Sequence, residues 1–287
     1  MKYVYAGTGG LNRAFIGAGH TLWQNNDTLN KGGKLTVGAN LNYLFGAVEE
    51  SRKAFYPAGN GYYNSTATSR LIVRSPTANI GLQYSADLIS AERAKARVRA
   101  HKDRLVAKDE REQMDWLNAG KDLKDRPVLK LTKREGEALR FRVGLSAELP
   151  SDLASRYSKL VNSFVLTAAG IEYAFDSSLV IDGARGMVHL PALFGVGFAV
   201  YNSHWTLTAE HRRRDWSQLR LDVEGFDQRS TLTTNAVYAL GASYRPAGDF
   251  GGSFFKRSIY RAGLRWSEDY LVVAGTQLNQ YGASFGL

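Results

Sequence analysis

A short alternation of residue types constrains the fold of this chain more than any other feature. In residues 34–46, KLTVGANLNYLFG, every second side chain from Leu35 to Phe45 is apolar, and those between are Thr, Gly or Asn apart from Leu44. Successive side chains of a β-strand point to opposite faces, so the segment predicts a strand with one apolar and one polar face. The apolar face points inward in a soluble sheet protein and outward in a barrel embedded in lipid, and the fold class depends on this choice.

The same alternation recurs along the chain. It predicts about ten strands of about 9–14 residues, which is long enough to cross a bilayer, whereas strands of globular proteins average about 5–6 residues. The predicted strands cover residues 11–23, 34–46, 69–86, 139–149, 162–175, 193–201, 204–212, 233–245, 259–267 and 280–287.

Two further features favour the outward direction. The polar positions hold Gly, Ser, Thr and Asn with isolated Arg and Glu, as in the crowded interior of a barrel, and aromatic residues such as Trp23, Tyr84, Trp205 and Trp266 lie near strand ends. We therefore predict an all-β fold, an antiparallel transmembrane β-barrel of the outer-membrane type, complete or in part, with residues 1–287 as one domain. A soluble β-sandwich or barrel is the alternative.

The composition excludes several other classes. No run of about 18 apolar residues is present, which excludes transmembrane helices. Cysteine is absent, which excludes disulfides, thiolate catalysis and cysteine-bound metals. The formal charge of +10 is compatible with nucleic acid, an anionic lipid surface or a basic barrel interior. The first residues, MKYVYAGTGG, lack the apolar core and cleavage site of a secretion signal, so no signal peptide is expected in this sequence.

Residues 89–135 depart from the strand pattern. The portion 90–117 is rich in Ala, Arg, Lys and Glu, with Ser90 as an expected N-cap and Gly120 as an expected stop. We predict a charged, partly helical insertion between two strands, which is either a solvated rim element or an arm that contacts anionic head groups.

The chain carries no catalytic or cofactor motif. Its five histidines share no metal-ligand spacing, and no GxSxG segment indicates a serine hydrolase. GTGG at residues 7–10 lacks the ending of a phosphate loop and is expected to kink or turn the chain. HRRRDW at residues 211–216 ends an alternating strand, so at most alternate arginines share a face, which argues against a nucleic-acid patch. We predict a protein that is not an enzyme and binds no cofactor or metal.

Charged residues at the polar positions of the predicted strands are the candidate functional residues. Inside a barrel such side chains must pair with one another or be hydrated. We expect most of them to form Arg–Glu pairs that stiffen the barrel, with some lining a solute path. The candidates facing the interior are Arg142, Glu148, Glu172, Glu210, Arg212, Arg261 and Arg265.

One family resemblance rests on residues 188–220, VHLPALFGVGFAVYNSHWTLTAEHRRRDWSQLR, and on residues 260–287, YRAGLRWSEDYLVVAGTQLNQYGASFGL. The order Leu-Pro, Phe-Gly-Val-Gly, a short turn, a strand opening with Trp205 and then Asp-Trp-Ser resembles FadL/TodX-type outer-membrane transport proteins. The second segment resembles a branch common in Bacteroidetes-type bacteria. The resemblance implies a barrel of the bacterial outer membrane that takes up hydrophobic small molecules, such as fatty acids or aromatic hydrocarbons.

Three functions follow from these observations. The leading expectation is uptake of hydrophobic small molecules, with outer-membrane lipid and a hydrophobic ligand as partners. The first alternative is a structural or secretion-accessory outer-membrane barrel that binds a protein partner of the envelope. The second alternative is a soluble basic β-protein that binds nucleic acid, although nucleic acid is not the expected partner.

Overall fold

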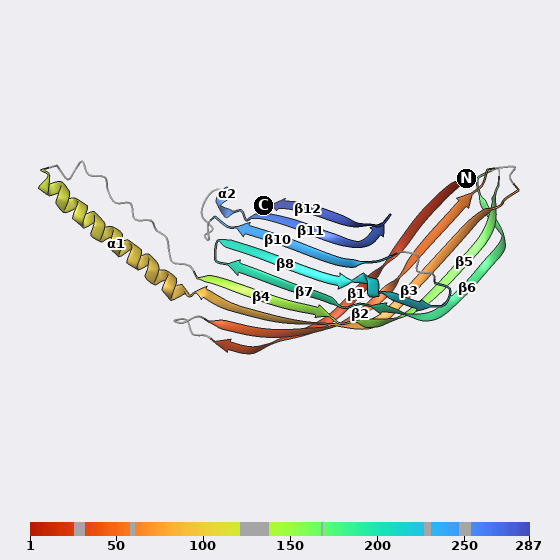
Figure 1. Ribbon diagram of the computed structural model, residues 1–287, viewed down its shortest axis with the longest axis horizontal. Coiled ribbons are helices and arrows are strands. Elements are labelled where there is room, and N and C mark those ends of the chain that lie inside the picture. Colours follow the sequence, from red (N-terminus) through yellow and green to blue (C-terminus); the bar gives the residue numbers. More distant parts are fainter. Residues whose placement is uncertain (26–31, 58–60, 121–137, 168, 227–230, 247–253) are drawn as a thin grey trace.

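The computed structural model describes residues 1–25, 32–57, 61–120, 138–167, 169–226, 231–246 and 254–287. In that part of the chain, twelve strands form one antiparallel sheet from which a long helix projects (Figure 1). The strands are β1 (Lys2–Asn25), β2 (Gly33–Phe55), β3 (Asn64–Ile89), β4 (Leu139–Glu148), β5 (Ser151–Leu166), β6 (Glu172–Leu190), β7 (Leu193–Tyr201), β8 (Trp205–Asp215), β9 (Arg220–Val223), β10 (Thr234–Tyr244), β11 (Tyr260–Val273) and β12 (Thr276–Gly286). The helical elements are α1 (Ala91–Asn118), the 3-10 turn η2 (Trp216–Gln218) and α2 (Phe254–Arg257).

The three long strands β1 to β3 form a spine that carries two wings. β4 pairs with the end of β3 that precedes α1, and β5 pairs with the opposite end of the same strand. The first wing continues from β4 through β7, β8, β10 and β11 to β12, and the second continues from β5 through β6 to β9. The spine bends between the wings, and this gives the sheet its angled shape (Figure 1).

The sheet is open. Within the described residues, β1 pairs only with β2 and β12 pairs only with β11, so both strands are free edges. The predicted antiparallel, strand-rich fold with a helical insertion is confirmed. The sheet of the described residues is not closed into a barrel, so the predicted outer-membrane barrel type is not confirmed. Alternation determines the face that each side chain occupies, and it does not determine whether the first and last strands meet.

Several strands differ from their predicted bounds. β1, β2 and β3 have 24, 23 and 26 residues because each continues past the bend. Residues 162–175, predicted as one strand, are divided between β5 and β6 by a turn in which the Thr167 N–H donates to the Ile171 carbonyl and Gly170 has a φ of 76°. The expected kink in residues 7–10 occurs within β1 at Gly9, whose φ is 101°.

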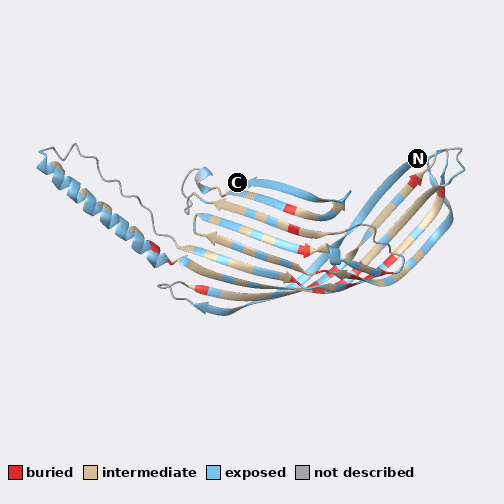
Figure 2. Ribbon diagram, viewed as in Figure 1, coloured by how far each residue is buried: buried red, intermediate tan, exposed pale blue. Residues whose placement is uncertain are grey.

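α1 lies between β3 and β4. The Ser90 hydroxyl accepts a hydrogen bond from the Arg93 N–H at 3.4 Å, so Ser90 is the N-cap. Only Ala94 of the helix is buried, and the helix extends away from the rim of the first wing (Figure 2). None of the described helices is long and apolar enough to cross a membrane. The rest of the predicted insertion, residues 121–135, lies outside the described residues.

A small hydrophobic core lies at the bend of the spine. Elsewhere the sheet is a single layer, so most side chains on both of its faces are at least partly exposed (Figure 2). The core consists of Leu44, Val73, Leu153 and Val188, with Leu71, Leu190, Leu219 and Leu221 packed against it.

Candidate functional site

Most residues predicted to face a barrel interior lie on one face of the first wing. Directly opposed residues of antiparallel strands share a face, so the register assigns each side chain. Glu210 of β8 lies opposite Ala239, which lies opposite Arg265 of β11. We call the face that carries Glu210 and Arg265 the polar face. The candidates on it are Arg142, Glu148, Glu210, Arg212, Arg261 and Arg265.

Glu148 is the centre of a buried cluster on the polar face. Its carboxylate accepts hydrogen bonds from Arg13 of β1, at 2.5 Å, and from Arg214 of β8. The side chains of Glu148 and Arg214 are each 9% exposed, and the Arg214 guanidinium lies 5.1 Å from the centroid of the Trp216 ring. Because β1, β4 and β8 are not neighbours, these ion pairs hold the sheet curved across the strands between them.

The other charges on the polar face are more exposed. Glu210 and Arg212 pair at 2.6 Å along β8, with about half of each side chain exposed. Arg142 lies 5.4 Å from the centroid of a tyrosine ring on β7. Neither Arg261 nor Arg265 has an ion-pair partner in the part of the chain that the structure describes. Two guanidinium groups therefore remain available on this face.

Sequence reasoning missed the partners of Glu148 and Glu172. Glu172 lies apart from the other candidates, at the start of β6 in the second wing, where it pairs with Lys53 of β2 at 2.6 Å. Arg214 occupies the next alternate position of β8 after Glu210 and Arg212, so the alternation already indicated that it lies on the same face. The long reach of Arg13 to Glu148 depends on strand register and curvature, which no local pattern encodes.

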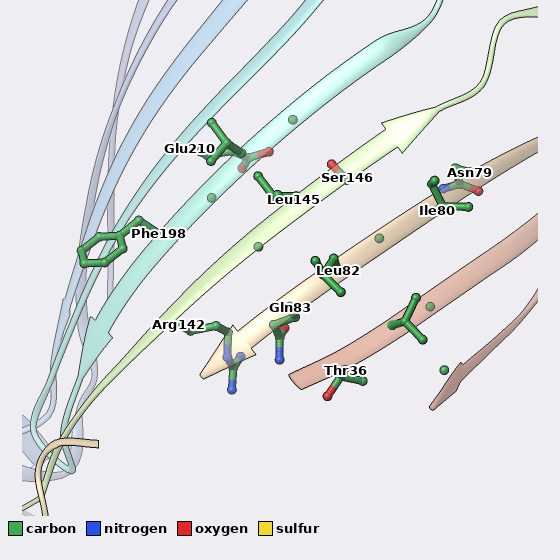
Figure 3. A pocket seen from close by; sticks show the side chains of 18 of the residues that line it. Thr36, Asn79, Ile80, Leu82, Gln83, Arg142, Leu145, Ser146, Phe198 and Glu210 are labelled. Carbon is green, nitrogen blue, oxygen red and sulfur yellow. The ribbon is translucent and has the colours of Figure 1, made fainter. Parts of the chain in front are cut away.

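A hollow of about 600 Å³ lies over β2, β3, β4, β7 and β8 (Figure 3). Its lining combines polar side chains, including Thr36, Gln83, Arg142, Ser146 and Glu210, with apolar ones, including Ile80, Leu82, Leu145, Val196 and Phe198. The hollow therefore offers a partner both hydrogen-bonding groups and apolar contacts. Glycines that contribute to the lining are Gly19, Gly38, Gly81, Gly144, Gly195 and Gly197.

The opposite face of the first wing, the apolar face, is exposed. Leu207 is 53% exposed and Leu264 is 60% exposed, so neither packs in a dry centre. With the adjoining parts of β1, β2 and β3, this face forms a contiguous apolar surface that crosses nine strands. Such a surface is larger than soluble monomers usually expose, and it needs an apolar covering. The register places on it Ile16, Leu41, Ile80, Leu82, Leu145, Val196, Phe198, Leu207, Leu240 and Leu264.

Rows of aromatic rings border the apolar face. Near the turn that joins β7 to β8, Trp205 stacks on Tyr244 with ring centroids 4.2 Å apart. Toward the bend, rings from four neighbouring strands form a ladder. Along β8 the two rows are separated by about 20 Å, given a rise of about 3.3 Å per residue. The ladder is His211, Tyr238, Trp266 and Tyr281, with successive centroid separations of 4.5, 4.9 and 6.5 Å.

Beyond the bend, the same face of the sheet is charged. Arg70 and Ile72 of β3 continue the face that holds Ile80, and Arg156 of β5 lies opposite Ile72. Arg156 also lies directly opposite Arg185 of β6. Charged side chains therefore interrupt the apolar surface beyond the bend, where the second wing combines them with exposed Leu160, Val180 and Met187 on the same face.

His189 links three strands of the second wing. Its Nδ1 lies 2.6 Å from a carboxylate oxygen of Asp152 on β5, and its Nε2 lies 3.0 Å from a carboxylate oxygen of Asp222 on β9. The hydrogen bond with Asp152, followed by that with Asp222, raises the pKa of His189 above its ordinary value of 6.5. The cluster fastens the short strand β9 to β6 and β5 most firmly when the imidazole is protonated.

Comparison with known proteins corrects the family prediction. The family model BamG matches residues 1–131 and 126–287, which together span the whole chain. The resemblance to FadL/TodX transporters is therefore wrong, and so is uptake of hydrophobic small molecules, which rested on that resemblance. No curated protein matches the chain. The chain belongs to the BamG family, which is named for the BAM complex of outer-membrane protein assembly.

Proposed function

We propose that this chain is a non-enzymatic accessory component of outer-membrane protein assembly, and that it acts in the bacterial outer membrane by binding a protein partner of the envelope. The observation that carries the proposal is the family match along the whole chain, because the BAM complex assembles outer-membrane proteins. The proposal corresponds to the accessory alternative that the sequence left open.

The two halves of the sheet support a position at the membrane. Acyl chains would cover the aliphatic band of the apolar face, and the aromatic rows on its borders suit the boundary between lipid and water. The arginines on the second wing suit water or head groups. The first wing would then anchor the protein, and the second wing would extend outside the hydrocarbon layer.

The polar face supports protein binding rather than conduction of a solute. In the part of the chain that is described, the sheet encloses no channel, because β1 and β12 do not meet. Glycines contribute to the lining of the hollow, and glycine lets another backbone approach a strand closely. Arg261 and Arg265 have no ion-pair partner among the described residues, and they would favour an acidic or carbonyl-rich surface on the partner.

Co-purification and depletion test the proposal. The full chain, carrying an affinity tag, would be purified from outer membranes in mild detergent, beside an unrelated outer-membrane protein with the same tag. We expect subunits of the BAM complex only with the tagged chain, and we expect depletion of the chain to lower the amounts of several unrelated outer-membrane proteins. No enrichment of BAM subunits, with unchanged amounts of those proteins after depletion, would contradict the proposal.

A further inference from the structure

Among the residues that the structure describes, β12 is a free edge that lacks the usual protection of an edge strand. It pairs with β11 on one side (Figure 1). Every residue of the strand except Gln277 is exposed. Its sequence, TQLNQYGASFG, contains no proline and no charged residue. Edge strands are usually shielded by charges, proline or a bulge, because unpaired backbone groups recruit other strands. β12 therefore presents an edge that a further strand can join.

The aromatic ladder of the apolar face ends at this edge without a closing partner. The rings of Trp266 and Tyr281 are nearly parallel, with an interplanar angle of 4°. Tyr281 is the last ring of the ladder and is 78% exposed, and Phe285 on the same face is 86% exposed. Since aromatic pairs on neighbouring strands stabilise a sheet, the vacant position beside Tyr281 fits another large ring.

The polar face of β12 has the opposite character. Gly282 and Ser284 alternate with Tyr281 and Phe285, and an added Cβ on Gly282 would meet no atom within 4 Å. A joining strand thus finds room for polar side chains on this face and apolar contacts on the other. Its matching pattern is an alternation of apolar residues with small or polar ones.

A second copy of the chain does not match this edge. Its edge strand β9 has only four residues, two of them charged, and is too short to pair along β12. Eight antiparallel pairings lead from β1 to β12, so these two free edges run parallel. A copy in the same membrane orientation would pair its β1 with β12 in parallel, whereas sheets of bacterial outer-membrane proteins are antiparallel. Pairing of β12 with β12 would be antiparallel only if the two copies pointed to opposite sides of the membrane.

We propose that the free edge of β12 receives an antiparallel strand from a different outer-membrane β-sheet protein, with an aromatic residue beside Tyr281. This inference rests on the proposed function and names the kind of partner and its point of contact. Exposed backbone groups in hydrocarbon are costly, so an edge beside an apolar band in lipid gains most from such a strand. Backbone pairing supplies affinity, and the alternating pattern supplies specificity.

Photo-crosslinking of the full chain in intact cells tests the proposal. Gly282 would be replaced by the photoreactive amino acid p-benzoylphenylalanine, for which the structure leaves space. We expect one adduct with an outer-membrane protein other than this chain, and the crosslinked peptide should be a strand that alternates apolar with small or polar residues. An adduct with a second copy, with lipid or with a soluble protein, or the lack of any adduct, would overturn the proposal.

Three control variants sharpen the test. The same replacement at Ala242, which lies on β10 between two paired strands and outside the hollow, should give no such adduct. Tyr281→Lys should lower the yield at position 282 by about tenfold, and Tyr281→Phe should preserve it, because the ring is what the partner strand meets. Equal yields for Tyr281→Lys and Tyr281→Phe would also overturn the proposal.

Co-purification with the tagged chain distinguishes failure of this inference from failure of the proposed function. If BAM subunits co-purify but position 282 gives no strand adduct, only the assignment of the β12 edge fails. If the adduct forms with a strand of another outer-membrane protein but BAM subunits do not co-purify, the edge assignment stands and the proposed function fails.

Discussion

At the scale of single residues, Glu148 is the side chain that links β1, β4 and β8. It is buried and pairs with two arginines, and Arg214 is equally buried. Glu148→Gln should therefore lower the free energy of unfolding by about 3–5 kcal/mol, because it leaves the charge of Arg214 buried without a counter-charge. Urea unfolding in detergent, followed by tryptophan fluorescence, measures the change.

Glu210→Gln is the matched control for Glu148→Gln. Glu210 lies on the same face and pairs with Arg212, but both side chains are about half exposed. Its replacement should cost less than about 1 kcal/mol, since water screens an exposed pair. Equal losses for the two variants would show that burial does not govern the cluster.

His189 gives the second wing a dependence on pH. Asp152 first, and then Asp222, raises its pKa in the folded protein above 6.5, so the stabilising charge is fully present below pH 6.5 and is lost as pH rises through the raised value. The free energy of unfolding of the natural protein should fall between pH 5.5 and pH 8.5 by more than that of His189→Gln. Urea titrations at both pH values test this, and identical pH dependence in the two proteins would remove His189 as the cause.

At the scale of elements, alternation predicted strands well only where one face is apolar. The predicted strands on β4, β7, β8, β10 and β11 lie close to the observed ones. Most of β5 was not predicted as a strand. Its buried face carries Ser155 and Tyr157, and its exposed face carries Asp152 and Arg156, so polar residues occur on both faces. Where neither face is continuously apolar, both phases contain polar residues and the period-two signal weakens.

The bend of the spine depends on the backbone of β1. Gly9 has a φ of 101°, and an added Cβ there would lie 2.1 Å from the carbonyl oxygen of Ala47. Gly9→Ala should lower the free energy of unfolding by about 1–3 kcal/mol, because it places a side chain in a strained backbone conformation. Gly10→Ala is the control, since its Cβ would meet no atom within 4 Å. Urea unfolding compares the two, and similar losses would contradict the special role of Gly9.

Two neighbouring residues of β8 allow a test of which face of the sheet meets lipid. Leu207 lies on the apolar face between the aromatic rows, and Thr208 lies next to it on the polar face. Leu207→Arg should cost about 2–4 kcal/mol in lipid vesicles, because the guanidinium would enter hydrocarbon, and Thr208→Arg should cost much less. Urea titration of the vesicle-folded proteins measures both. Equal effects would argue against lipid on the apolar face.

At the scale of the whole molecule, the sequence predicted the two faces of the first wing but neither its open edges nor its family. Val37, Leu82 and Leu145 each belong to an alternation of apolar and polar residues within their own strand. Their alignment in one row across the sheet follows from the strand register. Closure depends on strand number and stagger over the entire sheet, which a local period does not specify. Similar alternation occurs in unrelated outer-membrane sheets, and a resemblance built on it therefore led to a transporter family instead of the BamG family.

The position of the whole molecule in lipid can be measured with its own tryptophans. Trp205 and Trp266 lie on the apolar face, whereas Trp116 lies on α1, which extends away from the sheet. In single-tryptophan variants, with the other tryptophans replaced by Phe, lipids brominated on the acyl chain should quench Trp205 and Trp266 strongly and leave Trp116 bright, because bromine quenches only at close range. Quenching of Trp116 as strong as that of Trp266 would place the helix in the hydrocarbon. An unquenched Trp266 would remove the first wing from the membrane, and the apolar face would then require a protein covering instead.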